Sequence, residues 1–512
     1  MKTFIIFYVF IIIILSFQNL GDNLFNNIDS IARSDKLCPS QEFTKSNMNQ
    51  WPMYRYNAQH IGKSPYTTGE NPGGERWKFF SPKSISYHSP LIDANGILYC
   101  PDEFHKIYAI YPNGTIKWQR DLTGNNYMHQ PALGTDGTIY LGTDKHFYAL
   151  YSNGTTKWIL PIQNHFCSDP VIGSDDTIYA GTINGSFYAI NPNGTVNWTY
   201  NIGYRIIGAS IDSKGNIYFT GRYADYLYCL NPDGSLRWKF EAHMVMDAPT
   251  IGENDTIYID TDYYLIAINP NGTEKWKMHL PGFGTSPSIA PDGTLVFSSY
   301  QGPLVAGVKP DDGSILWSYR TNSDSRYKTP PCIGNDGTIY FAEDSGYLYA
   351  LTSNGLFKWR TRLTTEYTPY DGMYVESSPS IDSNGIVYVT SWFYRGGSNY
   401  TDIGYIHAIG GVKMQIPQEG YIYLFGRDVC PALLGSTIII GRLSVQVATF
   451  HEENVEYVEF IIDNRTRYVD SSPPFEWFLK GLLFGKHTLS IKGYYTDGAI
   501  SEENMKIISF II

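Results

Sequence analysis

Short apolar segments separated by tight turns recur along most of this 512-residue chain. A typical pair is Ile139-Tyr140, which follows the turn Asp136-Gly137, and Tyr148-Ala149-Leu150. Turn residues return at intervals of about 8–12 positions, and the apolar residues show no helical period. This spacing is typical of short antiparallel strands joined in a meander. The pattern therefore predicts an all-β protein.

A repeat of about 40 residues organises these strands. In each unit the first predicted strand starts at a Ser-Pro-like step such as Ser89-Pro90, and the second follows a turn that is often Asp-Gly. The third carries Tyr-Ala-Ile or a close variant, and the fourth contains a tryptophan. A four-stranded antiparallel unit repeated at this length is typical of a propeller blade. The repeated tryptophans are 38–42 residues apart: Trp77, Trp118, Trp158, Trp198, Trp238, Trp276, Trp317 and Trp359.

The number of units predicts an eight-bladed β-propeller. Eight first-strand segments begin near residues 89, 130, 169, 208, 248, 286, 329 and 378. The eighth unit ends at His407-Ala408-Ile409 without a tryptophan strand, whereas Trp77 precedes the first unit and has no blade of its own. Joining the two gives a last blade that is closed by the N-terminal strand, and it leaves no open sheet edge.

The unit reads S-P-x-I-x-x-D-G-T-I-Y-x-G, then Y-A-I-x-P-N-G-T-x-K-W, and it resembles the pyrroloquinoline-quinone-type (PQQ-like) propeller repeat. The segment from Trp51 to Pro65 resembles the one that precedes the first blade in exported members. The resemblance covers about residues 50–411. It implies a propeller whose tryptophans pack between neighbouring blades, and many propellers with this repeat are non-catalytic.

The same resemblance raises the alternative of a PQQ-dependent (quinoprotein) oxidoreductase. Such an enzyme would hold PQQ and Ca²⁺ in the channel with an aspartate base and, often, a vicinal disulfide. No two of the six cysteines are adjacent, and no Asp or Glu matches the catalytic or calcium positions residue by residue. We therefore expect no cofactor, and PQQ and Ca²⁺ only under this alternative.

After residue 411 the repeat stops and longer alternating strands follow, for example from Val455 to Asp463. Together with Pro473-Pro474-Phe475-Glu476-Trp477 and Gly485-Lys486-His487-Thr488-Leu489, they resemble Ig-like modules of secreted proteins. A generic β-sandwich is the alternative. We expect a PQQ-like propeller over 51–411 and an Ig-like β-sandwich with its lead-in strand over 412–512.

The N-terminus predicts export. Lys2 precedes an apolar run from Thr3 to Phe17, which suits a signal peptide and is shorter than a spanning helix. No small-x-small cleavage site follows, so an uncleaved anchor and membrane attachment through this segment stay open. We assign 1–20 to a signal peptide or N-terminal anchor, 21–50 to a linker, and the protein to an extracellular or cell-surface location.

Cysteine and asparagine usage adds two expectations for an exported chain. Most cysteines are expected to be buried small hydrophobes, with a Cys38–Cys430 pairing left open. The chain holds nine Asn-x-Ser/Thr sequences. Five of these asparagines precede glycine and predict type I′ hairpin turns instead: Asn113, Asn153, Asn184, Asn193 and Asn271.

Charge and motifs exclude several functions. A net charge of −11 argues against nucleic acid as a partner, because phosphate binding needs clustered cations. The sequence contains no HExxH, no Gly-x-Ser-x-Gly, no phosphate-binding GxxxxGK[ST] loop and no CxxC motif. Asp255, Asp260 and Asp262 are better explained as turn and strand-end residues than as a metal loop. We assign no catalytic, cofactor-binding or metal-binding residue.

Residues just before the innermost strand of each blade are expected to line a central funnel. Converging polar groups in one concavity form a candidate binding site. The alternative, which we favour for these residues, is that they solvate a channel and pair with each other. The candidates are His88, His129, Asp169, Asp247, Lys328 and Glu376, with Arg205 and Arg326 close by.

These observations favour an exported, non-catalytic binding or scaffold propeller. It would present its loops and central funnel to a protein, a glycan or a cell-envelope component. Enzymatic activity stays open, with the quinoprotein oxidoreductase as the first alternative. The second alternative is a propeller of envelope assembly, although no lipid-attachment cysteine directly follows the apolar segment.

Overall fold

The computed structural model describes residues 49–511, apart from gaps at 86–87, 124–127, 163, 246, 281–283, 300–303, 322–327, 364–372, 394–401, 419–420, 425–426, 433–436 and 480–482. The predicted signal peptide or anchor (1–20), nearly all of the linker (21–50) and Cys38 lie outside these residues. No helix in the described part of the chain is long and apolar enough to cross a membrane.

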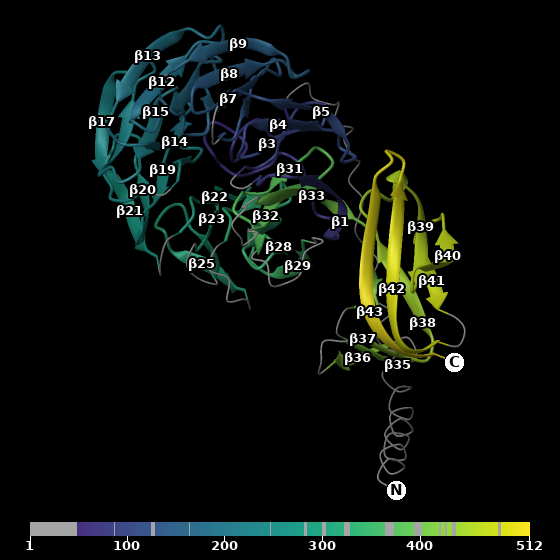
Figure 1. Cartoon of the computed structure of the whole chain (residues 1–512). Helices are drawn as coiled ribbons and strands as arrows, with labels where there is room; N and C mark the ends of the chain where they lie inside the picture. Colours follow the sequence, from purple (N-terminus) through teal and green to yellow (C-terminus); the bar gives the residue numbers. More distant parts are fainter. Residues whose placement is uncertain are drawn as a thin grey trace. The chain divides into compact units, whose positions relative to one another are not determined.

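Seven four-stranded antiparallel sheets follow one another around a ring (Figure 1). The first is β2 (Leu91–Ile92), β3 (Leu98–Pro101), β4 (Lys106–Ile110) and β5 (Ile116–Asp121). The second sheet is β6 (Ala132–Leu133), β7 (Ile139–Gly142), β8 (His146–Leu150) and β9 (Thr156–Pro161). The third is β10 (Val171–Ile172), β11 (Ile178–Gly181), β12 (Ser186–Ile190) and β13 (Val196–Asn201). The fourth is β14 (Ile206–Ile211), β15 (Ile217–Gly221), β16 (Tyr226–Leu230) and β17 (Leu236–Glu241). The fifth sheet is β18 (Thr250–Ile251), β19 (Ile257–Asp260), β20 (Tyr264–Ile268) and β21 (Glu274–His279). The sixth is β22 (Ser288–Ile289), β23 (Leu295–Ser298), β24 (Leu304–Val308) and β25 (Ile315–Arg320). The seventh is β26 (Cys332–Ile333), β27 (Ile339–Glu343), β28 (Tyr347–Leu351) and β29 (Phe357–Arg362).

The eighth blade is closed by the N-terminal strand, as the sequence predicts. Strand β1 (Gly74–Ser81) pairs antiparallel with β33 (Ile403–Gly411), and Trp77 lies opposite Ala408. The other strands of this sheet are β30 (Met373–Tyr374), β31 (Ser380–Ile381) and β32 (Val387–Phe393). The eight-bladed propeller is thus confirmed, with residues separated by more than 300 positions joined in one sheet.

Each repeated tryptophan lies on a turn glycine of the following blade. A Cβ added to Gly194 would lie 2.8 Å from the Trp158 ring, and the Trp158 indole N–H donates to the Pro192 carbonyl oxygen at 2.8 Å. The ring thus covers the turn and also binds its backbone. The tryptophan–glycine pairs around the ring are Trp77–Gly114, Trp118–Gly154, Trp158–Gly194, Trp198–Gly234, Trp238–Gly272, Trp276–Gly313, Trp317–Gly355 and Trp359–Gly73.

The prediction of type I′ turns at the Asn-Gly pairs is wrong. Only the glycine has a positive φ, as in Gly114 at 86°, whereas none of the five asparagines does. Tyr111 N–H donates to the Thr115 carbonyl oxygen, so the turn is a three-residue loop with a left-handed glycine. The Asn113 side chain accepts from both the N–H and the hydroxyl of Thr115. Asp233 plays this role in the fourth blade, which shows that the Asn-x-Thr pattern serves the turn.

The segment 49–73 runs along the inner strands before β1 begins. Trp51 forms a bridge with Ile92 of the first blade, and Asn71 donates to the Ile409 carbonyl oxygen of the eighth. Between these points, inner-strand N–H groups donate to carbonyl oxygens of the segment: Leu133 to Pro52, Ile211 to Ala58, Ile251 to Gln59, Ile289 to Ile61 and Ile333 to Gly62. The segment therefore satisfies backbone groups at the free ends of most inner strands.

Residues after 411 form two further sheets. One is β34 (Lys413–Ile416), β38 (Leu443–Ala448) and β41 (Glu476–Leu479). The other has the order β36 (Arg427–Pro431), β35 (Tyr421–Leu424), β37 (Thr437–Ile440), β43 (Ile500–Ile511), β42 (Leu483–Tyr495), β39 (Val455–Ile462) and β40 (Arg465–Asp470). A short 3-10 helix, η1 (Glu452–Asn454), precedes β39. Val445 and Ile491 come from different sheets and belong to one buried cluster, so the sheets share a core. The Ig-like assignment stays a prediction.

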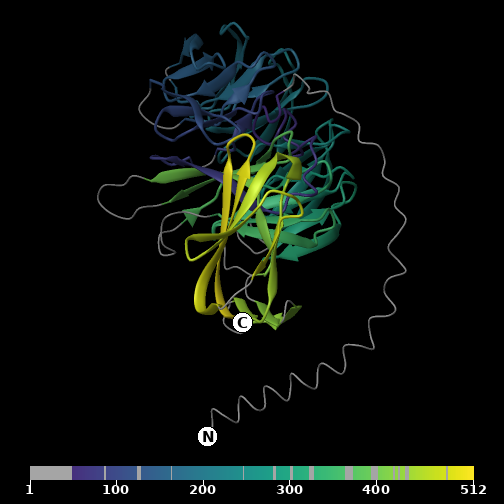
Figure 2. The ribbon, with the colours of Figure 1, turned by 90° about the vertical axis from the view of Figure 1, so that its right-hand side faces the viewer.

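Direct contacts join these sheets to the eighth blade. Arg76 of β1 forms an ion pair with Asp497 at 2.7 Å, and its guanidinium lies 3.9 Å from the centre of the Tyr495 ring. Val412 N–H donates to the hydroxyl of Ser501 at 3.1 Å. These contacts make the propeller and the C-terminal sheets one compact unit, viewed from a second side in Figure 2.

Buried cysteines agree with the expectation from their spacing. Four are free and buried within the blades: Cys100, Cys167, Cys229 and Cys332. The side chain of Cys430 and all of Cys38 lie outside what the structure describes, so their pairing stays a prediction.

Candidate functional site

Four of the predicted funnel residues form a linked group that we call the ring-centre cluster: His88, His129, Asp169 and Asp247. Each precedes the first strand of a different blade, so the repeat itself brings them toward the axis. The proline that follows in each start step favours an extended backbone and has no N–H to donate to the strand ladder. The cluster is therefore a product of the blade repeat.

Direct contacts link the cluster to its surroundings. His129 Nδ1 lies 4.0 Å from Asp169 Oδ1, which also accepts the Gln130 N–H at 3.2 Å. Asp247 Oδ1 accepts the N–H of Ala248 at 2.8 Å, and its Oδ2 accepts the Tyr54 hydroxyl at 3.2 Å. The side chains of His129 and Asp169 are 21% and 29% exposed, so this part of the cluster is open to a ligand.

Burial changes the protonation of the acids. It raises the pKa of Asp169 to about 7, and the nearby negative charge of Asp247 adds to the shift. Burial also raises the pKa of Asp247, although the Arg55 guanidinium and two hydrogen bonds oppose this. Asp260 on β19 behaves alike, since burial raises its pKa to about 7. Asp169 and Asp260 therefore have pKa values near neutral pH, where a carboxyl group can donate as well as accept a hydrogen bond when it holds the proton.

The histidines of the cluster are neutral. Burial lowers the pKa of His129 to about 4, and the positive charge of Arg205 contributes. Burial lowers the pKa of His88 to about 3, with a smaller contribution from His129. A neutral imidazole presents one donor and one acceptor, so the cluster suits a polar ligand better than an anion.

Three buried polar atoms of this region have no hydrogen-bond partner among the described residues. They are His88 Nδ1, Gln130 Nε2 and Asp260 Oδ2. Buried polar atoms are nearly always hydrogen-bonded, to protein, water or a ligand. These atoms add donor and acceptor capacity to the ring centre that the surrounding protein leaves unused.

The remaining predicted residues are placed differently. Lys328 lies 3.6 Å from Glu343, and both side chains are fully buried. Glu376 accepts the indole N–H of Trp392 at 2.9 Å. Both therefore pair within the blades, as the alternative interpretation expects. Arg205 lies near enough to His129 to act on its charge, and Arg326 lies outside the described residues.

Sequence reasoning missed the contribution of the segment before the first blade. The Tyr54 hydroxyl reaches Asp247, and the fully buried Arg55 donates to the Pro287 carbonyl oxygen at 2.6 Å and to the Ser288 hydroxyl at 2.9 Å. Asp260, set aside as a strand-end residue, is completely buried. The signal that could have indicated this contribution is Arg55 between Tyr54 and Tyr56, in a segment that has no strand pattern.

The ring centre does not fit the cofactor of the oxidoreductase alternative. Pyrroloquinoline quinone carries three carboxylates and needs cations around it, whereas this region presents Asp169, Asp247 and Asp260. The guanidinium of Arg55 is directed to hydroxyl and carbonyl oxygens instead. Among the described residues, no group of three or more His, Cys, Asp or Glu side chains is placed to hold a metal ion.

Comparisons with known proteins agree with the fold. The family model described as "Outer membrane protein assembly factor BamB" matches residues 68–207 and 184–330, together just over half of the chain. No curated protein matches the chain.

Solved structures with a similar fold have different activities. Quinohemoprotein alcohol dehydrogenase from Comamonas testosteroni has a TM-score of 0.54 at 12% identity, over 74% of this chain and 83% of that one. A europium-containing methanol dehydrogenase has 0.52 at 12%, over 71% and 99%. The C-terminal WD40 domain of Sif2 has 0.52 at 14%, over 67% and 97%. At such identities the likeness shows the fold alone.

Proposed function

Since the chain belongs to the PQQ-like β-propeller repeat family whose model is described as an outer membrane protein assembly factor, we propose that it is an exported, non-catalytic binding propeller that acts on a protein partner of the cell envelope. The observation that carries this proposal is the ring-centre cluster. Groups from four blades meet there, two of them are partly exposed, and the neutral histidines and protonated acids suit hydrogen bonding.

The same proposal covers location and domain organisation. Export rests on Lys2 and the apolar run to Phe17, with membrane attachment through that run as its variant. The propeller extends over 51–411, because β33 ends at Gly411 and the C-terminal sheets start at Lys413. An Ig-like module over 412–512 is supported by strand order: β34 pairs with β38, and β37 joins β43 in parallel.

A role in envelope assembly is the second candidate, and the family match favours it. An envelope-assembly role differs from a scaffold role only in what the bound partner does. One capture experiment therefore tests both roles. A photo-crosslinking residue replaces His129 in the exporting host, and a matched control replaces Asn153 in an exposed outer turn. Recovery of one envelope protein at position 129 and not at 153 supports the proposal. Equal capture at both positions contradicts it.

The oxidoreductase alternative is tested separately. Purified full-length chain is mixed with pyrroloquinoline quinone and Ca²⁺, and both bound-cofactor absorbance and dye-linked alcohol oxidation are measured. We expect neither signal, because the Arg55 guanidinium is directed to hydroxyl and carbonyl oxygens of the protein. In addition, no group of three or more described His, Cys, Asp or Glu side chains is placed to hold Ca²⁺. Activity that is lost in Asp169→Asn would overturn the non-catalytic assignment.

A further inference from the structure

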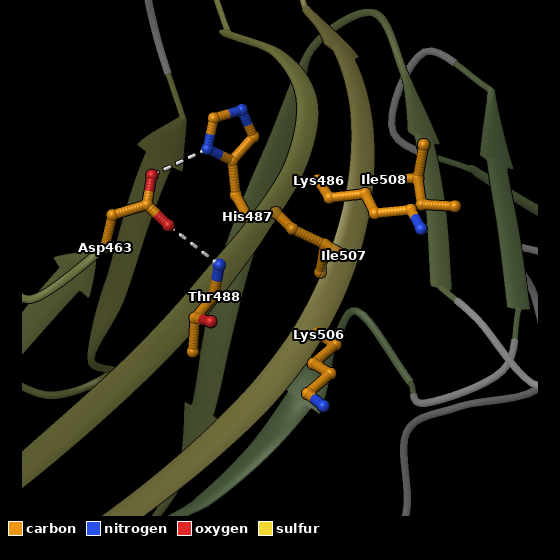
Figure 3. Close-up of a pocket in the computed structure, with 7 residues that line it drawn as sticks. All are labelled: Asp463, Lys486, His487, Thr488, Lys506, Ile507 and Ile508. Carbon is orange, nitrogen blue, oxygen red and sulfur yellow. Dashed lines mark hydrogen bonds and ion pairs between the residues drawn. The ribbon is translucent and has the colours of Figure 1, made fainter.

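A second polar site lies on the C-terminal sheets, away from the ring-centre cluster. A hollow of about 260 Å³ is bordered by strands β42 and β43 and by the turn between β39 and β40 (Figure 3). Its lining residues are Asp463, Lys486, His487, Thr488, Lys506, Ile507 and Ile508. This volume is at the small end for ligand sites, so it suits a single small unit such as one sugar ring.

Two lysines of the hollow have no counter-charge. Lys486 pairs with Ile508 and Thr488 pairs with Lys506 across the hairpin, which places both lysines on one face as diagonal neighbours about 7–8 Å apart. Both are exposed, and neither forms an ion pair within the described part of the chain. By contrast, Lys492 on the same hairpin pairs with Glu502 at 4.0 Å. Two unpaired cations in a chain of net charge −11 form a local anion site.

The one acid of the hollow is already engaged. Asp463 accepts from the Thr488 N–H at 3.0 Å and from His487 Nδ1 at 2.7 Å, and these bonds lower its pKa (Figure 3). His487 Nε2 lies 3.1 Å from the Phe484 carbonyl oxygen. Both ring nitrogens of His487 thus face oxygen atoms of the protein. The Asp463 carboxylate is therefore held by hydrogen bonds within the protein, and the two lysines outnumber it in the hollow.

An aromatic pair continues the same face. Phe484 lies directly opposite Phe510, two residue pairs beyond Lys486 and Ile508 and therefore on the same face. The two phenylalanines are 54% and 47% exposed. Cations beside an exposed apolar surface fit a ligand that has both an anionic group and an apolar face. A sugar ring with a carboxylate or sulfate has this combination.

We infer that this hollow binds an acidic sugar unit of an anionic glycan, with its carboxylate or sulfate held by Lys486 and Lys506 and its apolar face against Phe484 and Phe510. The inference does not rest on the ring-centre proposal. A membrane surface also attracts lysine and phenylalanine, but the recessed shape and the fixed Asp463–His487 pair favour a discrete ligand.

The test measures binding of trigalacturonate to the full chain by calorimetry, with neutral maltotriose as the comparison ligand. The protein is made without N-linked glycans, since Asn464-Arg465-Thr466 adjoins Asp463. We expect trigalacturonate to bind, and to bind about tenfold more weakly in the Lys486→Gln/Lys506→Gln double variant. The binding of trigalacturonate weakens with added salt.

Two further variants separate this site from general charge effects. Lys492→Gln removes the paired lysine of the same hairpin and leaves affinity unchanged, whereas Phe484→Ser weakens it by about threefold or more. Thermal melts check that each variant folds. The inference is overturned if trigalacturonate fails to bind, if maltotriose binds equally well, or if the double variant keeps full affinity. It is also overturned if the chain binds only phosphatidylserine vesicles.

Discussion

The packing of a tryptophan on a glycine of the next blade predicts a specific pattern of instability. A Cβ added to Gly272 would lie 2.8 Å from the Trp238 ring, whereas one added to Gly293 would meet nothing within 4 Å. Both glycines have the same φ of 86° and both end an Asn-Gly or Asp-Gly turn. Gly293→Ala is therefore a matched control that carries the backbone cost without the clash.

The magnitudes follow from this geometry. Alanine at a left-handed φ costs about 1–2 kcal/mol, and this applies to both variants. In Gly272→Ala the ring must also retreat, because ordinary carbon contacts are about 3.5–4.0 Å. Such overpacking costs about 1–3 kcal/mol. The Trp238 N–H also loses its 3.1 Å bond to the Pro270 carbonyl oxygen, worth about 0.5–1.5 kcal/mol. Gly272→Ala should thus be less stable than Gly293→Ala by about 1.5–4.5 kcal/mol.

Urea unfolding followed by tryptophan fluorescence measures this difference, provided that both variants keep the slope of the wild type. A shift of the emission maximum in folded Gly272→Ala that is absent from Gly293→Ala would show that the surroundings of a tryptophan have changed. Equal loss of stability in the two variants would refute the reasoning, because the Trp238 ring could then move away from the added methyl group without loss of stability.

Three other perturbations test other parts of the molecule. Burial raises the pKa of Asp260 to about 7, whereas an aspartate in the unfolded chain has a pKa of about 3.9. The native state therefore holds this proton more tightly, and the stability of the wild type falls as the pH rises from about 4 to about 7. Asp260→Asn has no proton to lose, and its urea midpoint should exceed that of the wild type at pH 8 and converge with it near pH 4; parallel pH profiles would contradict this. Arg55→Met removes three hydrogen bonds at a fully buried position. Because buried acceptors lose a donor, the free energy of unfolding should fall by about 1–3 kcal/mol in the same assay. A loss well below about 1 kcal/mol would mean that the segment 49–73 contributes little. Arg76→Ala breaks the ion pair with Asp497 and the contact with Tyr495 and should speed proteolytic cleavage after residue 411, whereas an unchanged cleavage rate would show that the C-terminal sheets are held by other contacts.

The architecture was predictable because the repeat carries it. The repeat leaves one tryptophan strand, at Trp77, without a blade, and one blade, ending at Ile409, without a tryptophan strand. The two complete each other, and β1 pairs with β33 accordingly. The side chains at the ring centre were less predictable. His129 and Asp169, which both precede an inner strand, lie 4.0 Å apart, but Lys328 at an equivalent position pairs with Glu343 on its own blade. Local pairing decides such cases, and a repeat pattern does not encode it.

The segment before the first blade shows a second limit. Its backbone binds inner strands of blades that lie between about 40 residues (Trp51 to Ile92) and about 270 residues (Gly62 to Ile333) further along the chain, so no local periodicity marks it. The turn prediction failed for a related reason. Asn113-Gly114 suits several turn types, and the Thr115 side chain, which binds Asn113, favours the three-residue loop.

Closure of the ring by β1 has a consequence for the order in which the chain is made. Strand β1 leaves the ribosome before any blade but finds its partner β33 only after more than three hundred further residues have been synthesised. Until then strand β1 has no partner strand, and the eighth blade lacks its outer strand. Contacts this distant in sequence slow folding and expose strand edges in the meantime. Completion of the propeller therefore waits until β33 has been synthesised, and a chain truncated before Ile403 should remain an open, aggregation-prone array of seven blades.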